Sequence, residues 1–252
     1  MKQKIGNINI NMKMEDLEDL LDIVRGHEIW LECDERRVRV GEKAECKLGF
    51  GHNMRSERAV SVEKVKANLF NPEGEMRGLE VDVGVGEGHL IIPFTPKHEG
   101  NYTIAAEYDG GILDLPHSPS PKYYSQYAKT IVAVGGGQRS GESVITGKEL
   151  EITLNFKNQY RTGDKVALQV LYDGAALPDE TVSAICGSCE DPIEMKTDSK
   201  GEATFELNQE GNWMFMVRHK DPEKGVEGLY DEKALTATFT VNCLAEAAKE
   251  TK

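Results

Sequence analysis

The sequence lacks a long hydrophobic run and an excess of positive charge. Its apolar stretches are all shorter than the roughly 18 residues of a membrane-spanning helix, so we expect a chain that is not itself membrane-spanning. Polar residues follow Lys2 and Lys4, so no signal peptide is visible, and this predicts a cytoplasmic protein. The formal net charge is -13. Because nucleic-acid binding needs a basic surface, we expect no nucleic-acid partner.

Motifs of catalysis and of phosphate binding are also missing. The chain has no G-x-S-x-G elbow, no H-E-x-x-H motif and no dinucleotide fingerprint after a strand. Residues 136–143 have the spacing of a phosphate-binding loop, but Glu142 stands where that loop needs Lys and would repel phosphate. With no nucleophile–base pair or paired carboxylates either, we predict that the protein is not an enzyme.

The cysteines are few and widely spread. Five is an odd number, and Cys33 and Cys46 do not have the spacing of an immunoglobulin disulfide, so we expect no disulfide framework. Cys186 and Cys189 form one C-x-x-C pair, whereas a structural zinc site normally needs four ligands. We interpret this pair as a hairpin turn with two incidental thiols, and a redox or metal role is the alternative.

What the sequence does contain is a series of short alternating runs that predict an all-β protein. Apolar and polar residues alternate, and clusters of Gly, Pro, Asn and Asp separate the runs, as in two tandem β-sandwiches of which the first is immunoglobulin-like. Before them, Leu17, Leu20, Leu21 and Val24 share one stripe of a short N-terminal helix. We predict an N-terminal extension with this helix (1–26), a first sandwich (27–134), a linker (135–147), a second sandwich (148–243) and a tail (244–252).

Three of the six histidines border turns marked by Gly or Pro, where a side chain is more often exposed than packed and could bind a ligand. These are His27, His52 and His117. Imidazole nitrogens suit nickel, copper and zinc, so three imidazoles from separate loops predict a transition-metal site. Glu28 and Asp114 are candidate oxygen donors or supporting residues.

The distance between His27 and His52 depends on how residues 27–50 fold. In an up-down-up meander the two histidines would lie at opposite ends and could not share an ion. If residues 27–40 form one kinked edge strand, the strand that ends near Phe50 returns antiparallel and the histidines meet. We favour the kinked strand, since it is common in immunoglobulin-like sandwiches.

Several sequence segments, short phrases of consecutive residues, resemble those of a family of extracytoplasmic β-sandwich proteins. Members of this family contain a domain of unknown function and are encoded beside nickel and cobalt uptake transporters. The phrases are His27-Glu-Ile-Trp30-Leu31, Arg39-Val-Gly-Glu42, Leu48-Gly-Phe-Gly-His52 and Phe94-Thr-Pro with Glu99-Gly-Asn-Tyr102, and in the second half Gly174, Leu177-Pro178, Val182, Thr197-Asp198, Gly201-Glu-Ala-Thr-Phe205 and Gly211-Asn-Trp213. The second-half phrases also recur in transthyretin-like and carboxypeptidase-regulatory-like modules, which implies that fold for the second sandwich.

The resemblance implies an additional periplasmic nickel-binding component of such transporters, with His27 and His52 matching the family's recurrent histidines. It implies an extracytoplasmic location, in disagreement with the missing signal peptide. Our main hypothesis is therefore an accessory protein that binds nickel or cobalt (copper or zinc being the other candidates) and has a metal-uptake transporter as partner. The alternative is a non-enzymatic β-sandwich module that binds a protein or carbohydrate and has no metal site.

Overall fold

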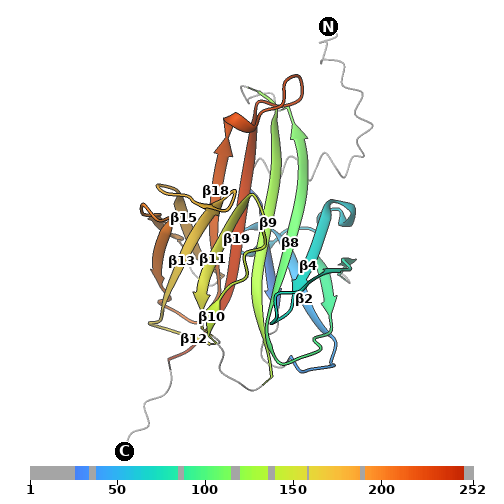
Figure 1. Ribbon diagram of the computed structural model, residues 1–252, viewed down its shortest axis with the longest axis vertical. Helices are drawn as coiled ribbons and strands as arrows, with labels where there is room; N and C mark the ends of the chain where they lie inside the picture. The colour runs from blue at the N-terminus through green and yellow to red at the C-terminus, as the bar shows by residue number, and fades with distance from the viewer. Residues whose placement is uncertain are drawn as a thin grey trace, which may run out of the picture.

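The computed structural model describes residues 26–33, 38–84, 88–114, 120–135, 140–157, 159–187 and 191–246. Within these ranges nearly all regular structure is β-strand, arranged in three sheets (Figure 1), and the predicted all-β sandwich class is confirmed. No helix in the described ranges is long and apolar enough to cross a membrane. The predicted N-terminal helix and the last six residues of the predicted tail lie outside the described residues.

A central sheet of nine strands runs through the molecule, in the order β16-β15-β18-β19-β9-β8-β4-β5, with β12 paired to β19. Its strands are β4 (Val65–Phe70), β5 (Met76–Leu79), β8 (Gly100–Leu113), β9 (Lys122–Val134), β12 (Tyr160–Arg161), β15 (Thr181–Cys186), β16 (Ile193–Lys196), β18 (Gly211–Asp221) and β19 (Glu232–Leu244). The 3-10 turns η2 (Val62–Lys64) and η3 (Pro222–Lys224) precede β4 and follow β18.

Two smaller sheets of five strands each flank the central sheet. The first contains β1 (Glu28–Cys33), β2 (Ala44–His52), β3 (Arg55–Ser56), β6 (Asp82–Val83) and β7 (His89–Phe94). The second contains β10 (Gly141–Glu142), β11 (Leu150–Phe156), β13 (Lys165–Tyr172), β14 (Ala175–Ala176) and β17 (Glu202–Glu206).

The two small sheets pack on opposite faces of the central sheet. Ala128 and Val132 of β9 belong to the hydrophobic core shared with the first small sheet, whereas Tyr127 and Ile131 belong to the core shared with the second. Successive side chains of a strand point to opposite faces, so each face of β9 serves one sandwich. Strand β9 also pairs in parallel with β19, which joins the N-terminal and C-terminal halves in one sheet. The predicted domain boundaries stay a prediction.

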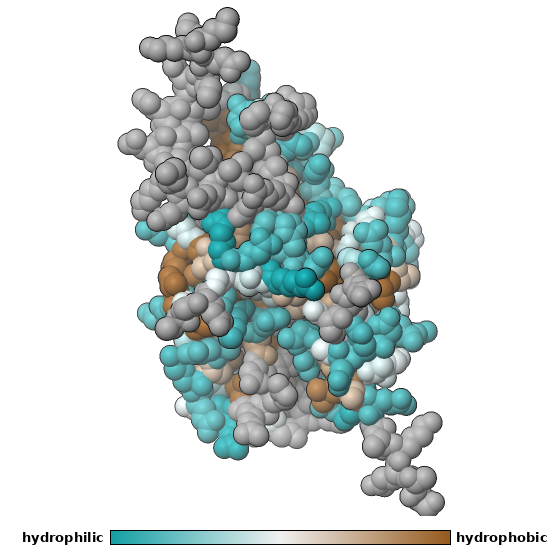
Figure 2. Space-filling view, turned by 180° about the vertical axis from the view of Figure 1, so that it is seen from behind, coloured by the Kyte–Doolittle hydropathy of each residue, from teal (hydrophilic) through white to brown (hydrophobic). Residues whose placement is uncertain are grey.

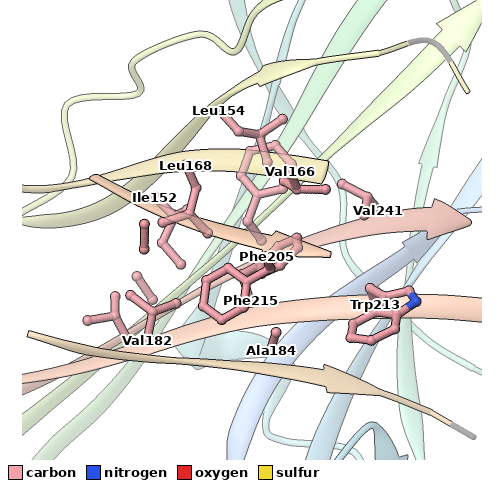
Figure 3. Packing of buried hydrophobic residues seen from close by; sticks show 14 of the residues in the cluster. Ile152, Leu154, Val166, Leu168, Val182, Ala184, Phe205, Trp213, Phe215 and Val241 are labelled. Atoms are coloured by element: carbon pink, nitrogen blue, oxygen red, sulfur yellow. The ribbon is translucent and has the colours of Figure 1, made fainter. Parts of the chain in front are cut away.

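The core of the C-terminal half is rich in aromatic residues. Figure 3 shows Leu154, Val166 and Leu168 opposite Phe215 and Trp213. Because such interiors are close-packed, the loss of one buried aromatic side chain of this kind costs about 3–5 kcal/mol. On the outside, Figure 2 shows one face on which hydrophilic side chains predominate and hydrophobic ones occur in small groups, as the large net charge requires.

Strand β1 lies across the central sheet and is held there by buried polar side chains of β9 and β19. Gln126 accepts from the Ile29 N–H at 2.8 Å and donates to the His27 carbonyl at 3.0 Å. Thr238 donates to the Ile29 carbonyl, and Thr240 donates to the Leu31 carbonyl. These side chains bind main-chain groups on the edge of β1 that has no strand partner among the described residues. The bonds also fix the position of His27.

Two sequence-based expectations need correction. Cys33 and Cys46, expected to be separate thiols, form a disulfide between paired residues of β1 and β2. The stretch from Gly110 to Ala128 is rich in Gly, Pro, Ser and Tyr, which predicts one long loop. It instead contains the end of β8 and the start of β9. In contrast, the turn before Tyr102 in the sequence predicts a tyrosine corner, and the corner is present. The Tyr102 hydroxyl accepts from the N–H groups of Lys97 and His98 and donates to the His98 carbonyl.

Candidate metal centre

The antiparallel pairing of β1 with β2 brings His27 and His52 to the same end of the first small sheet. Glu28 pairs with Gly51, so His27 directly precedes the pair and His52 directly follows it. The two imidazole rings are 4.0 Å apart between centroids. The histidines therefore do not lie at opposite ends, as the up-down-up meander would require. The antiparallel return expected of the kinked strand is present, but β1 ends at Cys33 and residues 38–43 are not in a strand.

A tight hairpin adds a third side chain, Glu57, which sequence reasoning missed. Asn53 and Met54 have positive φ angles of 50° and 59° and form the turn between β2 and β3. The chain then returns along β2, and the Glu57 N–H donates to the Phe50 carbonyl at 3.0 Å. Gly51 permits this close return, since a Cβ atom there would lie 2.1 Å from the Arg55 carbonyl oxygen.

Glu57 bridges the two imidazoles. Its Oε2 lies 3.0 Å from His27 Nε2, and its Oε1 lies 3.1 Å from His52 Nδ1. Hydrogen bonds from His52 and then His27 lower the pKa of the Glu57 carboxyl below its usual range, so the ionised form is favoured. His27 is buried beside the Phe50 ring, whereas the His52 and Glu57 side chains are 40% and 52% exposed. The cluster therefore opens to solvent on one side.

Glu28 has a different environment, although it is next to His27 in sequence. Its side chain is buried, and its carboxylate accepts from the Asn53 N–H at 2.9 Å and from Arg218 Nη2 at 3.1 Å. Burial raises the pKa of this carboxyl, and the Arg218 charge offsets part of that effect. Both Glu28 oxygens therefore accept hydrogen bonds, one from the residue that follows His52 and one from Arg218.

Of the other two predicted site residues, the structure describes one, Asp114, and it lies away from the cluster. His117 lies outside the described residues. Asp114 follows the end of β8 and is exposed. Tyr108 of β8 pairs with Gln126, which bonds to His27. Asp114 is six residues further along, or about 20 Å at the usual rise per residue.

The donor set of His27, His52 and Glu57 suits a divalent transition-metal ion. The three candidate ligand atoms all lie within 4.8 Å of one another. Ligands about 2.0–2.2 Å from an ion are about 3 Å apart when they are at right angles, close to the two distances that Glu57 makes. Two imidazoles and one carboxylate fit nickel, cobalt, copper or zinc, and three protein ligands leave coordination positions open.

Glu57 had a detectable but weak sequence signal. Asn53 directly follows His52, and Asn is one of the residues that adopts the left-handed conformation most readily. A two-residue turn at that point would have returned Glu57 to the level of Phe50. The Met54 at the second turn position gives no such signal, because a long side chain rarely adopts a positive φ.

Comparisons with solved structures give low similarity. A DUF4785 family protein from Legionella pneumophila is 12% identical, over 75% of this chain and 50% of its own length, with a TM-score of 0.30. The alpha-2-macroglobulin of Escherichia coli is 13% identical over 84% of this chain and 15% of its own, with a TM-score of 0.28. Two fibronectin type III domains of chicken tenascin are 13% identical over 84% and 97%, with a TM-score of 0.23. We draw no conclusion from scores this low, and this chain spans only half of the Legionella protein.

The family comparison covers most of the chain. The family described as "Domain of unknown function (DUF4198)" matches residues 24–221. This range includes the candidate metal cluster and Arg218, together with every strand from β1 to β18. The chain therefore belongs to the DUF4198 family.

Proposed function

We propose that this protein is an accessory protein of metal uptake or delivery that binds one divalent transition-metal ion, nickel or cobalt. The observation that supports the proposal most is the placement of two imidazoles and one carboxylate at the open end of the first small sheet. A metal ion would take the place of the hydrogen bonds between Glu57 and the imidazoles, and each neutral ring would bind it through the nitrogen that now faces Glu57, with its proton on the other ring nitrogen. The choice of nickel or cobalt, and of a metal-uptake transporter as partner, comes from the sequence resemblance.

The open coordination positions suit a protein that passes its ion on. A structural zinc site is normally closed by four protein ligands, whereas these three residues leave room for water or for a ligand from a partner. His117 remains a predicted further ligand. The ion is cargo in this proposal, and the proposed function includes no catalytic step.

The alternative is an interaction module without a metal site, and one observation favours it. Glu57 already accepts hydrogen bonds from both imidazoles, so the three side chains satisfy one another without an ion. The two functions differ in a measurable way. A metal site binds nickel stoichiometrically, whereas a hydrogen-bonded cluster of this kind requires no metal.

Calorimetric titration with nickel separates the two. We expect one Ni²⁺ per wild-type chain, and at least tenfold weaker binding by His52→Ala and by Glu57→Gln, because each change removes one ligand. His98→Ala is the matched control, since His98 is exposed and lies at the start of the tyrosine corner. Weak binding that is equal in wild type and His52→Ala would reject the metal function and leave the interaction module.

A further inference from the structure

Arg218 comes from the C-terminal half and contacts the residues on both sides of His27. It lies on β18, within the central sheet. Its Nη2 donates to the Gly26 carbonyl at 2.7 Å and to Glu28 Oε2 at 3.1 Å. The guanidinium therefore holds the main chain before His27 and the side chain after it.

Glu28 extends this contact to the second histidine strand. Its other oxygen accepts from the main-chain N–H of Asn53, the residue that follows His52. Asn53 is in the left-handed conformation and begins the hairpin that carries Glu57. The Glu28 carboxylate therefore connects Arg218 with Asn53. Glu28 directly follows His27 and Asn53 directly follows His52, so Arg218 is linked to both histidine strands.

We propose that Arg218 is a positioning residue of the metal site, so that metal affinity depends on a contact between the two halves of the molecule. This inference rests on the proposed function. Partners that orient metal ligands from outside the coordination sphere typically contribute 10–100-fold to affinity. Linkage is reciprocal, so metal binding also strengthens the contact between the first small sheet and β18.

The same two strands offer a matched control. Asn212, near the start of β18, donates to Glu32 of β1 at 3.4 Å. This contact also joins β1 to β18, but Glu32 pairs with Lys47 and lies toward the end of β1 that is remote from the imidazoles. A general loosening of β1 would follow from loss of either contact, whereas a positioning role belongs to Arg218 alone.

The experiment uses the full chain with nickel calorimetry and the visible absorption of the Co²⁺ complex. We expect Arg218→Ala to bind Ni²⁺ 10–100-fold more weakly than wild type and to change the Co²⁺ spectrum, because the imidazoles lose their fixed orientation. Asn212→Ala should match wild type in both measurements. Urea denaturation in the presence of a chelator checks that each variant folds.

The outcomes separate this inference from the proposed function. Absence of nickel binding by wild type would reject the function, and the positioning role with it. Wild-type binding together with Arg218→Ala affinity within about twofold and an unchanged spectrum would overturn the positioning role alone. An equal loss in Asn212→Ala would also overturn it. If Arg218→Ala does not fold, Arg218→Gln is measured instead. The same affinity threshold and the same comparison of Co²⁺ spectra then decide the outcome.

Discussion

Two glutamates beside the imidazoles are in opposite electrostatic environments. Glu57 is half exposed and accepts hydrogen bonds from His52 and His27, which lower the pKa of its carboxyl. Glu28 is buried, and desolvation raises the pKa of its carboxyl although Arg218 is near. The first environment favours an ionised group that can bind a cation. The second makes the charge of Glu28 costly for the folded state.

The cost of the Glu28 charge predicts a pH-dependent effect of Glu28→Gln. A carboxyl whose pKa is raised by folding is ionised in both states at neutral pH, and the native state then carries the burial cost. As the pH falls through the raised pKa to the unfolded value, the native state binds the proton first and the cost disappears. The free energy of unfolding of Glu28→Gln, relative to that of wild type, should therefore be higher at pH 7 than at pH 4.

Urea denaturation of metal-free protein at the two pH values measures this difference. Glu63→Gln makes the same charge change at an exposed position on η2 and controls for net charge. An advantage of Glu28→Gln that is greater at pH 4 than at pH 7 would mean that charge pairing with Arg218, and not burial, controls Glu28.

At the scale of elements, the β1–β2 pair has the candidate metal cluster at one end and a disulfide at the other. Cys33 pairs with Cys46 at the far end of the ladder from Glu28 and Gly51. Thirteen positions separate the two cysteines in the sequence. A crosslink of this length lowers the entropy of the unfolded chain, and its loss costs about 3 kcal/mol.

We therefore expect reduction of wild type, or the double change Cys33→Ser with Cys46→Ser, to lower the free energy of unfolding by about 3 kcal/mol. Urea denaturation with and without reductant measures it. The reductant should have no effect on the double variant, which provides the control. Equal unfolding midpoints for oxidised and reduced wild type would contradict the prediction.

The elements also show what sequence patterns can and cannot predict. The sequence pattern alone predicts strands at 165–172 and 181–186, and these are the bounds of β13 and β15. Alternation and flanking turn residues define both strands locally. The Asp109-Gly110-Gly111 stretch has the composition of a turn, and its sequence predicts one. Instead the register between β8 and β9 shifts between Asp109 and Gly111, as in a β-bulge, and both strands continue. Glycine is typical of turns and of bulges, so composition alone could not distinguish them.

The candidate site was predictable only where local sequence patterns decide the structure. His27 and His52 could be placed together because one pair of neighbouring strands decides their separation. Glu57 depends on a turn whose second residue, Met54, has an uncommon conformation for its type. The contact of Arg218 with Gly26 joins residues 192 positions apart, and no local pattern predicts such a contact.

At the scale of the whole molecule, the parallel pairing of β9 with β19 makes one sheet of both halves. Both strands are covered on two faces, and a buried ion pair lies on the face toward the second small sheet. Lys129 of β9 contacts Glu151 of β11 at 2.5 Å, and Glu151 also accepts from Thr146 and Gly147. Burial lowers the pKa of Lys129, and the Glu151 charge offsets part of that effect.

Removal of one partner of this buried ion pair should lower the free energy of unfolding far more than removal of one partner of a partly exposed ion pair. Lys129→Met leaves Glu151 buried without its cation, so we expect a loss of about 3–5 kcal/mol of unfolding free energy. Lys148→Met is the matched control, because the pair of Lys148 with Glu107 is partly exposed and worth up to about 1 kcal/mol. Urea denaturation of both variants at pH 7 gives the comparison, and equal losses would contradict it.

The most direct test of the metal site is anomalous diffraction from crystals of the full chain grown with nickel. We predict one anomalous peak per chain, about 2.0–2.3 Å from His27 Nε2, His52 Nδ1 and a Glu57 carboxylate oxygen. No peak at the open end of β1 and β2, or a fully occupied peak elsewhere with the hydrogen bonds of Glu57 to both imidazoles intact, would contradict the account.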